Sequence, residues 1–113
     1  MKLVFLYHPV NNLTESLTFY REKLGFVEAW REGDHTVALT LPESDVRLLI
    51  EEGEKNMAAG GVFLVDSVDS YFEEQRHTLD FVKEPVDIPP GRYAIFKDIS
   101  GNYIRILDFS KED

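Results

Sequence analysis

The spacing of apolar residues in the first half of the chain predicts one helix among four strands. An apolar stripe that recurs at helical spacing, and is expected to be buried, consists of Leu13, Leu17, Tyr20 and Leu24. Asn12 precedes this stripe as a helix N-cap with Glu15 three residues later, and Gly25 supplies a left-handed stop. Short apolar runs predict strands over residues 3–7, 26–31, 36–41 and 46–51. The predicted order is therefore βαβββ.

The same order recurs in the second half of the chain. Residues 53–59 show no clear period and are interpreted as a linker. After it, strands are predicted over residues 61–65, 81–83, 93–97 and 103–109. Ser67 is the predicted N-cap of a helix whose apolar stripe consists of Val68, Tyr71, Phe72 and Leu79. The segment that begins at Val65 matches the segment at Val10, 55 positions earlier, so the chain is predicted to be a tandem of two degenerate modules, about 1–54 and 60–113.

Length and composition bound the class of protein. At 113 residues the chain is predicted to form a single domain. A formal net charge of −9, from 12 basic and 21 acidic residues, repels phosphate backbones and argues against nucleic acid as a partner. The absence of cysteine excludes disulfides, thiolate metal sites and cysteine nucleophiles. No apolar run approaches the length that a bilayer requires, and we expect no signal peptide, no membrane partner and a cytoplasmic location.

Two phrases of the sequence point to a family. Residues 16–26 read Ser-Leu-Thr-Phe-Tyr-Arg-Glu-Lys-Leu-Gly-Phe, and residues 98–106 read Asp-Ile-Ser-Gly-Asn-Tyr-Ile-Arg-Ile. Together they resemble the opening helix and closing hairpin of the glyoxalase / bleomycin-resistance / extradiol-dioxygenase superfamily, also called vicinal oxygen chelate proteins. The resemblance implies an α+β fold in which tandem βαβββ modules form a curved mixed sheet around a cleft. It also implies a homodimer.

The resemblance further implies where a metal ion would be held. In the metalloenzymes of the superfamily the ligands come from the first and last strand of each module, and the corresponding positions here are Phe5, Leu49 or Arg47, Gly60 and Arg105. None of these residues offers the imidazole or carboxylate donors that divalent metals need. The three histidines, His8, His35 and His77, match no metal motif by their spacing. We therefore expect no metal and no other cofactor.

Strand parity suggests what the cleft offers instead. Successive side chains of a strand alternate between faces, so Leu6, His8 and Val10 are expected to face the helix. The candidate ligand-binding residues on the opposite, concave face are Phe5, Tyr7, Trp30, Arg47, Leu49 and Arg105, and other residues expected there are Glu28, Glu51 and Leu107. Aromatic walls with a few polar groups are typical of a pocket for an organic small molecule.

A structural interpretation of the same residues stays open. The aromatic residues also suit a filled cleft or a dimer interface. Arg47 and Glu51 suit a structural ion pair, and so do Arg105 and Glu28. The two arginines favour a carboxylate or phosphate on a ligand, whereas the acidic surface favours a cation, so the sign of the ligand's charge is left open.

Three functions are compatible with the sequence. The first is a metal-independent small-molecule-binding protein of this superfamily, such as a resistance or sequestration factor, with no catalytic residue assigned. The second is a metal-dependent glyoxalase-type lyase or dioxygenase whose ligands lie elsewhere. The third is a protein whose cleft is filled by aromatic side chains and whose role is contact with a partner. Whether the protein is an enzyme stays open.

Overall fold

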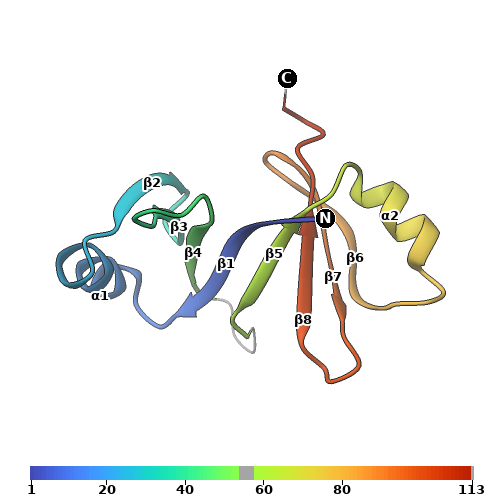
Figure 1. The fold of residues 1–113 in the computed structure, drawn as a ribbon, viewed down its shortest axis with the longest axis horizontal. Coiled ribbons are helices and arrows are strands. Elements are labelled where there is room, and N and C mark those ends of the chain that lie inside the picture. The colour runs from blue at the N-terminus through green and yellow to red at the C-terminus, as the bar shows by residue number, and fades with distance from the viewer. Residues whose placement is uncertain (54–57, 113) are drawn as a thin grey trace. The chain divides into compact units, whose positions relative to one another are not determined.

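A computed structural model of the chain describes residues 1–53 and 58–112 (Figure 1). Most of the linker predicted over residues 53–59 lies outside the described residues. The chain divides into two compact units. One spans Val4–Ala59, and the other contains Gly60–Asp113 together with Met1–Leu3. No helix in the described part of the chain has the length and apolarity needed to cross a bilayer.

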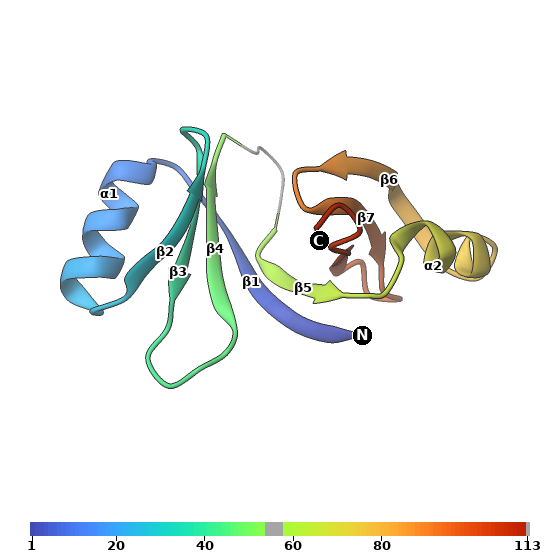
Figure 2. The same ribbon diagram turned by 90° about the horizontal axis from the view of Figure 1, so that it is seen from above.

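The unit Val4–Ala59 is a four-stranded sheet covered on one side by a helical segment. Its elements are β1 (Lys2–Val10), α1 (Leu13–Thr18), the π-helical turn η1 (Phe19–Lys23), β2 (Val27–Glu32), β3 (Thr36–Thr40) and β4 (Arg47–Glu52). The strand order is β2-β3-β4-β1, with β1 parallel to β4 and the other neighbours antiparallel. Figure 2 shows α1 on one side of these strands. The core between helix and sheet consists of Leu13, Leu17, Val37, Leu39, Leu48 and Ile50.

The ends of the first helix follow from its sequence. The side chain of Asn12 accepts a hydrogen bond from the Glu15 backbone N–H at 2.9 Å, which confirms the predicted N-cap. Gly25, at φ +72°, takes the left-handed conformation that ends the helix. The prediction that Leu24 is buried is wrong, since 46% of it is exposed. The cause is η1, whose wider turn rotates the following residues away from the stripe begun by Leu13 and Leu17.

The second unit repeats the βαβββ order. Its elements are β5 (Gly60–Leu64), α2 (Val68–Gln75), β6 (Asp80–Ile88), β7 (Gly91–Lys97) and β8 (Tyr103–Leu107), with strand order β5-β8-β7-β6. β5 is parallel to β8, and the remaining neighbours are antiparallel. The core against α2 consists of Val68, Ala94, Phe96 and Ile106. Ser67 accepts a hydrogen bond from the Ser70 backbone N–H at 3.1 Å, so this N-cap is also confirmed. The fold is α+β, as predicted.

Strand β6 is longer than the sequence indicates. Only residues 81–83 are predicted as strand, whereas β6 extends to Ile88 and includes Pro85. A proline lacks the N–H that a central strand needs, but β6 is the last strand of its order and pairs on one side only. Two register shifts, between Phe81 and Lys83 and between Lys83 and Val86, absorb the irregularity.

The turn between β7 and β8 explains the second sequence phrase. Asp98 Oδ1 accepts hydrogen bonds from the backbone N–H groups of Ser100 and Asn102, both at 2.8 Å, and Gly101 has φ +87°. The side-chain amide of Asn102 donates to Asp98 Oδ2 at 3.0 Å. These bonds, first of all those from Asn102, hold the pKa of Asp98 below its usual value. The phrase therefore encodes a side-chain-stabilised turn.

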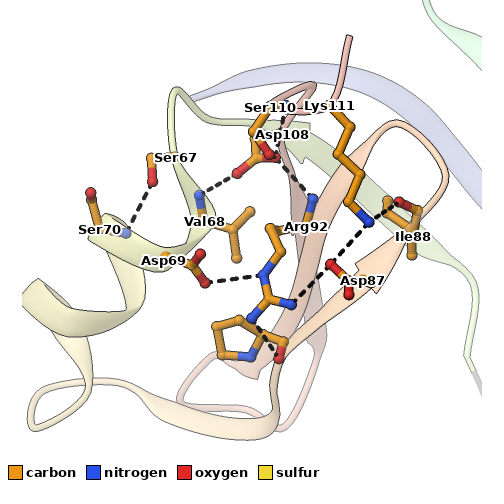
Figure 3. A network of polar contacts seen from close by, with 11 residues as sticks. Ser67, Val68, Asp69, Ser70, Asp87, Ile88, Arg92, Asp108, Ser110 and Lys111 are labelled. Atoms are coloured by element: carbon orange, nitrogen blue, oxygen red, sulfur yellow. Dashed lines mark hydrogen bonds and ion pairs between the residues drawn. The ribbon is translucent and has the colours of Figure 1, made fainter.

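A polar network joins the C-terminal segment to α2 and to the β6–β7 hairpin (Figure 3). The buried carboxylate of Asp108 accepts hydrogen bonds from the backbone N–H groups of Val68 at 2.7 Å, Arg92 at 2.9 Å and Ser110 at 3.1 Å. The Ser110 hydroxyl donates to the same carboxylate at 2.7 Å. Outside this centre, the Arg92 guanidinium contacts Asp69 and Asp87, both at 3.2 Å. The network is structural, since its polar groups satisfy one another.

Candidate functional site

The cross-strand register gathers five of the six candidate residues on one face of the Val4–Ala59 unit. Phe5 is paired with Arg47 and Tyr7 with Leu49 between β1 and β4. Leu49 is in turn paired with Ala38, and Ala38 with Trp30. Paired residues lie on the same face of a sheet, and the core residues that alternate with them face α1. The candidate residues therefore share the face opposite α1, which we call the open face.

Two aromatic rings form the apolar part of the open face. The rings of Phe5 and Trp30 lie edge to face, with centroids 5.9 Å apart and planes at 87°. Phe5 is buried, whereas 36% of Trp30 remains exposed. Leu49, half-buried, adds aliphatic surface between Arg47 and Glu51 on β4. This edge-to-face pair leaves part of an indole surface accessible, and such surfaces suit contact with organic molecules.

The polar part of the open face is centred on Glu51. The Tyr7 hydroxyl donates to Glu51 Oε1 at 3.0 Å, and the Thr36 hydroxyl donates to Glu51 Oε2 at 2.7 Å. Within the described part of the chain, no ion pair joins Glu51 to Arg47, so the structure does not support the alternative of a structural pair between them. Sequence reasoning missed Thr36. A usable signal was that Thr36 begins the predicted strand 36–41 and Glu51 ends the next predicted strand, 46–51. An antiparallel hairpin brings two such ends together, and the structure pairs Thr36 directly with Glu51.

The placement of Glu28 on the open face is also wrong. Glu28 is paired with Leu39, a core residue, and a register shift separates it from Trp30. A bulge of this kind inserts an extra residue, so the parity counted from Trp30 does not hold at Glu28. The Glu28 carboxylate accepts a hydrogen bond from Arg31 Nη2 at 2.8 Å, first of the causes that lower the pKa of Glu28. Glu28 is thus paired locally.

The sixth candidate, Arg105, lies in the other unit. It is fully buried and is paired with Val62 on β5 and Ile95 on β7, on the side away from the core against α2. Its guanidinium lies 5.7 Å from the centre of the Tyr103 ring. The nearest atom to a Cβ built at Gly60 is Arg105 Nη1, at 3.2 Å. The absent side chain of Gly60 therefore leaves the space beside the guanidinium.

The residues at the expected metal positions do not fit a divalent cation. Arg105 is cationic and Gly60 has no side chain, so neither offers a donor atom for a metal ion. The side chains of Phe5 and Leu49 contain only carbon and hydrogen. Among residues 1–53 and 58–112 no group of three or more histidine, aspartate or glutamate side chains is arranged to hold a metal ion. His8, as predicted, faces the helical side, where its Nδ1 lies 3.4 Å from the Tyr20 hydroxyl.

A separate hollow of about 600 Å³ lies in the second unit, beside the start of α2. It is lined in part by Lys2, Ser70, Tyr71 and Glu74. None of the candidate residues lines it. This hollow is therefore distinct from the open face.

Comparison with known proteins places the chain in a family. A family profile described as the Glyoxalase/Bleomycin resistance protein/Dioxygenase superfamily matches residues 3–106. The chain belongs to this superfamily. The resemblance inferred from residues 16–26 and 98–106 is thus confirmed. Among functionally curated proteins, none matches the chain.

Solved structures support the same fold. Methylmalonyl-CoA epimerase from Mycobacterium tuberculosis is 15% identical, with a TM-score of 0.75 over 95% of this chain and 87% of that one. A structure described as NAD-dependent benzaldehyde dehydrogenase from Legionella pneumophila is 17% identical, with a TM-score of 0.75 over 93% and 97%. A superfamily member from Vibrio splendidus 12B01 is 17% identical, with a TM-score of 0.65 over 95% and 97%. At these identities the likeness concerns the fold alone.

Proposed function

We propose that this superfamily member binds a small organic molecule on its open face without a metal ion. The residues proposed to contact the ligand are Phe5, Tyr7, Trp30, Arg47 and Leu49. Arg105 stays a candidate contact within its own unit. The role proposed for this binding is resistance or sequestration, and no residue is assigned to catalysis.

One relationship carries the proposal: Phe5 is both the ring partner of Trp30 and the cross-strand partner of Arg47. A partly exposed tryptophan therefore lies on the same face as an exposed arginine. Aromatic surface supplies apolar contact, and the guanidinium orients an acidic or other acceptor group of the ligand. The absence of donor side chains at Phe5, Leu49 and Gly60 supports binding without a metal ion.

Two measurements test this proposal. Titration of ¹⁵N-labelled protein with indole and phenyl compounds should shift the Trp30 indole signal and the amide signals of Phe5 and Arg47. Elemental analysis of protein purified without chelator should find far less than one Zn, Ni, Mn or Fe per chain. Stoichiometric metal, bound with high affinity, would contradict the proposal and favour a metal-dependent lyase or dioxygenase. Homodimerisation, expected from the family, is tested by sedimentation velocity.

A further inference from the structure

We infer that Glu51 is a ligand-binding carboxylate and that the ligand carries a protonated nitrogen. The inference rests on the proposed function, because it names the chemical class that the open face accepts. The ligand class is an organic ammonium or amidinium ion with an apolar body. Arg47, Leu49 and Glu51 follow one another on the open face of β4, so this face presents a cation, an apolar side chain and an anion in a row.

The Glu51 carboxylate is held in place by neutral donors. The hydroxyls of Tyr7 and Thr36 each bond to a different carboxylate oxygen, at 3.0 and 2.7 Å. Each oxygen of an ionised carboxylate accepts more than one hydrogen bond, so both keep capacity for a further donor. Because two strands fix the group from opposite sides, a ligand would not have to order it on binding. The carboxylate is thus oriented but not neutralised by these two partners.

The charged groups around Glu51 favour a cation. Arg47 lies four residues from Glu51 on the same strand, so their Cα atoms are about 13 Å apart at roughly 3.3 Å per residue. Arg47 is therefore not an immediate neighbour of Glu51. Glu32, the cross-strand partner of Thr36, adds a second acidic residue at the Glu51 end. The net charge of −9 attracts cations to the protein as a whole. A protonated nitrogen at Glu51 would form charge-assisted hydrogen bonds, while the body of the ligand would extend over Leu49 toward Trp30 and Arg47.

Three matched indoles test the inference by NMR titration or calorimetry. Tryptamine carries a protonated nitrogen, tryptophol replaces it with a hydroxyl, and indole-3-acetate replaces it with a carboxylate. The wild-type protein should bind tryptamine at least tenfold more tightly than tryptophol. Glu51→Gln should remove this preference, chiefly by weakening the binding of tryptamine. Thr36→Val, which releases one carboxylate oxygen, should reduce the preference and serves as the second variant if Glu51→Gln does not fold.

Glu52→Gln is the matched control. Glu52 is the next residue of β4, so it points to the other face, and its carboxylate lies 3.8 Å from His35. The Glu52→Gln substitution removes the same charge from the same strand and should leave the preference for tryptamine over tryptophol intact. Three results would overturn the inference while the proposed function stands. Glu51→Gln could keep the preference for tryptamine, Glu52→Gln could lose as much of that preference as Glu51→Gln, or the wild-type protein could bind indole-3-acetate more tightly than tryptamine. If no indole binds the wild-type protein, the proposed function itself fails.

Discussion

The carboxylate of Asp108 accepts a hydrogen bond from the backbone N–H of Val68, 40 residues earlier in the chain, at 2.7 Å (Figure 3). This bond satisfies one of the N–H groups that have no partner within α2, because the first turn of a helix lacks intrahelical acceptors for its donors. A buried carboxylate with four hydrogen bonds is also a demanding group to replace. The end of β8 and the start of α2 thus depend on a single side chain.

Replacement of Asp108 by asparagine should destabilise the fold. The amide nitrogen would face N–H donors in place of a carboxylate oxygen, so at least one buried group would lose its partner, at a cost of about 1–3 kcal/mol. Urea denaturation followed by circular dichroism measures this change. Asp45→Asn, on an exposed loop residue, is the control and should change the unfolding free energy by less than about 0.5 kcal/mol. If Asp108→Asn and Asp45→Asn changed the unfolding free energy equally, the stabilising role assigned to the Asp108 hydrogen bonds would be contradicted.

Acid should weaken the fold, and part of this effect should depend on Asp108. Burial by itself would raise the pKa of Asp108, but the hydrogen bonds from Val68, Ser110 and Arg92 outweigh it and hold the pKa below the usual 3.8. Hydrogen bonds from Lys111 and then Arg92 also lower the pKa of Asp87 below 3.8.

A carboxyl group with a lower pKa in the folded state binds fewer protons there than in the unfolded chain. Its contribution is therefore complete above about pH 4, close to the unfolded pKa, and is lost as the pH falls through the lower folded value. The urea concentration at the unfolding midpoint should be measured from pH 7 to pH 3. It should decrease once the pH is lowered below about 4. The difference in urea midpoint between wild type and Asp108→Asn should become smaller below about pH 4. A difference that stays constant would rule out a stabilising role for the ionised Asp108 carboxylate.

Leu17→Ala should cost about 2–5 kcal/mol, because it opens a cavity in the core between α1 and its sheet. Leu24→Ala removes the same atoms from a residue that is 46% exposed, and its cost should be much smaller. The comparison uses two leucines of one predicted stripe. Chemical denaturation of both variants measures the difference, and equal costs would show that the helical turn at Phe19–Lys23 does not rotate Leu24 outward as described.

Trp30→Ala should weaken binding of an aromatic ligand while the fold stays intact. Trp30 lies on the open face and is 36% exposed, so its truncation should remove a proposed ligand contact more than core packing. We expect a loss of roughly tenfold or more in affinity, with an unfolding midpoint close to wild type. Isothermal titration calorimetry measures the affinity, and thermal melting measures the unfolding midpoint. Unchanged affinity would exclude Trp30 from the site.

The sequence predicted the elements that depend on residues close together in the chain. The caps at Asn12 and Ser67 and the turn at Asp98 each use a side chain that bonds to backbone within a few residues. The predictions failed where the backbone departs from a regular period. A π-helical turn exposed Leu24, and a bulge next to Trp30 turned Glu28 to the helical face.

The sequence by itself determined that two βαβββ modules form, because helical and strand periods and local caps are properties of short segments. It also placed Phe5 with Tyr7 on one face of β1 and Arg47 with Leu49 on one face of β4, since alternation within a regular strand is fixed. Only the tertiary structure decided which polar groups meet there. Tyr7 and Glu51 are separated by 44 residues, and their bond depends on the register between β1 and β4, which no local pattern specifies.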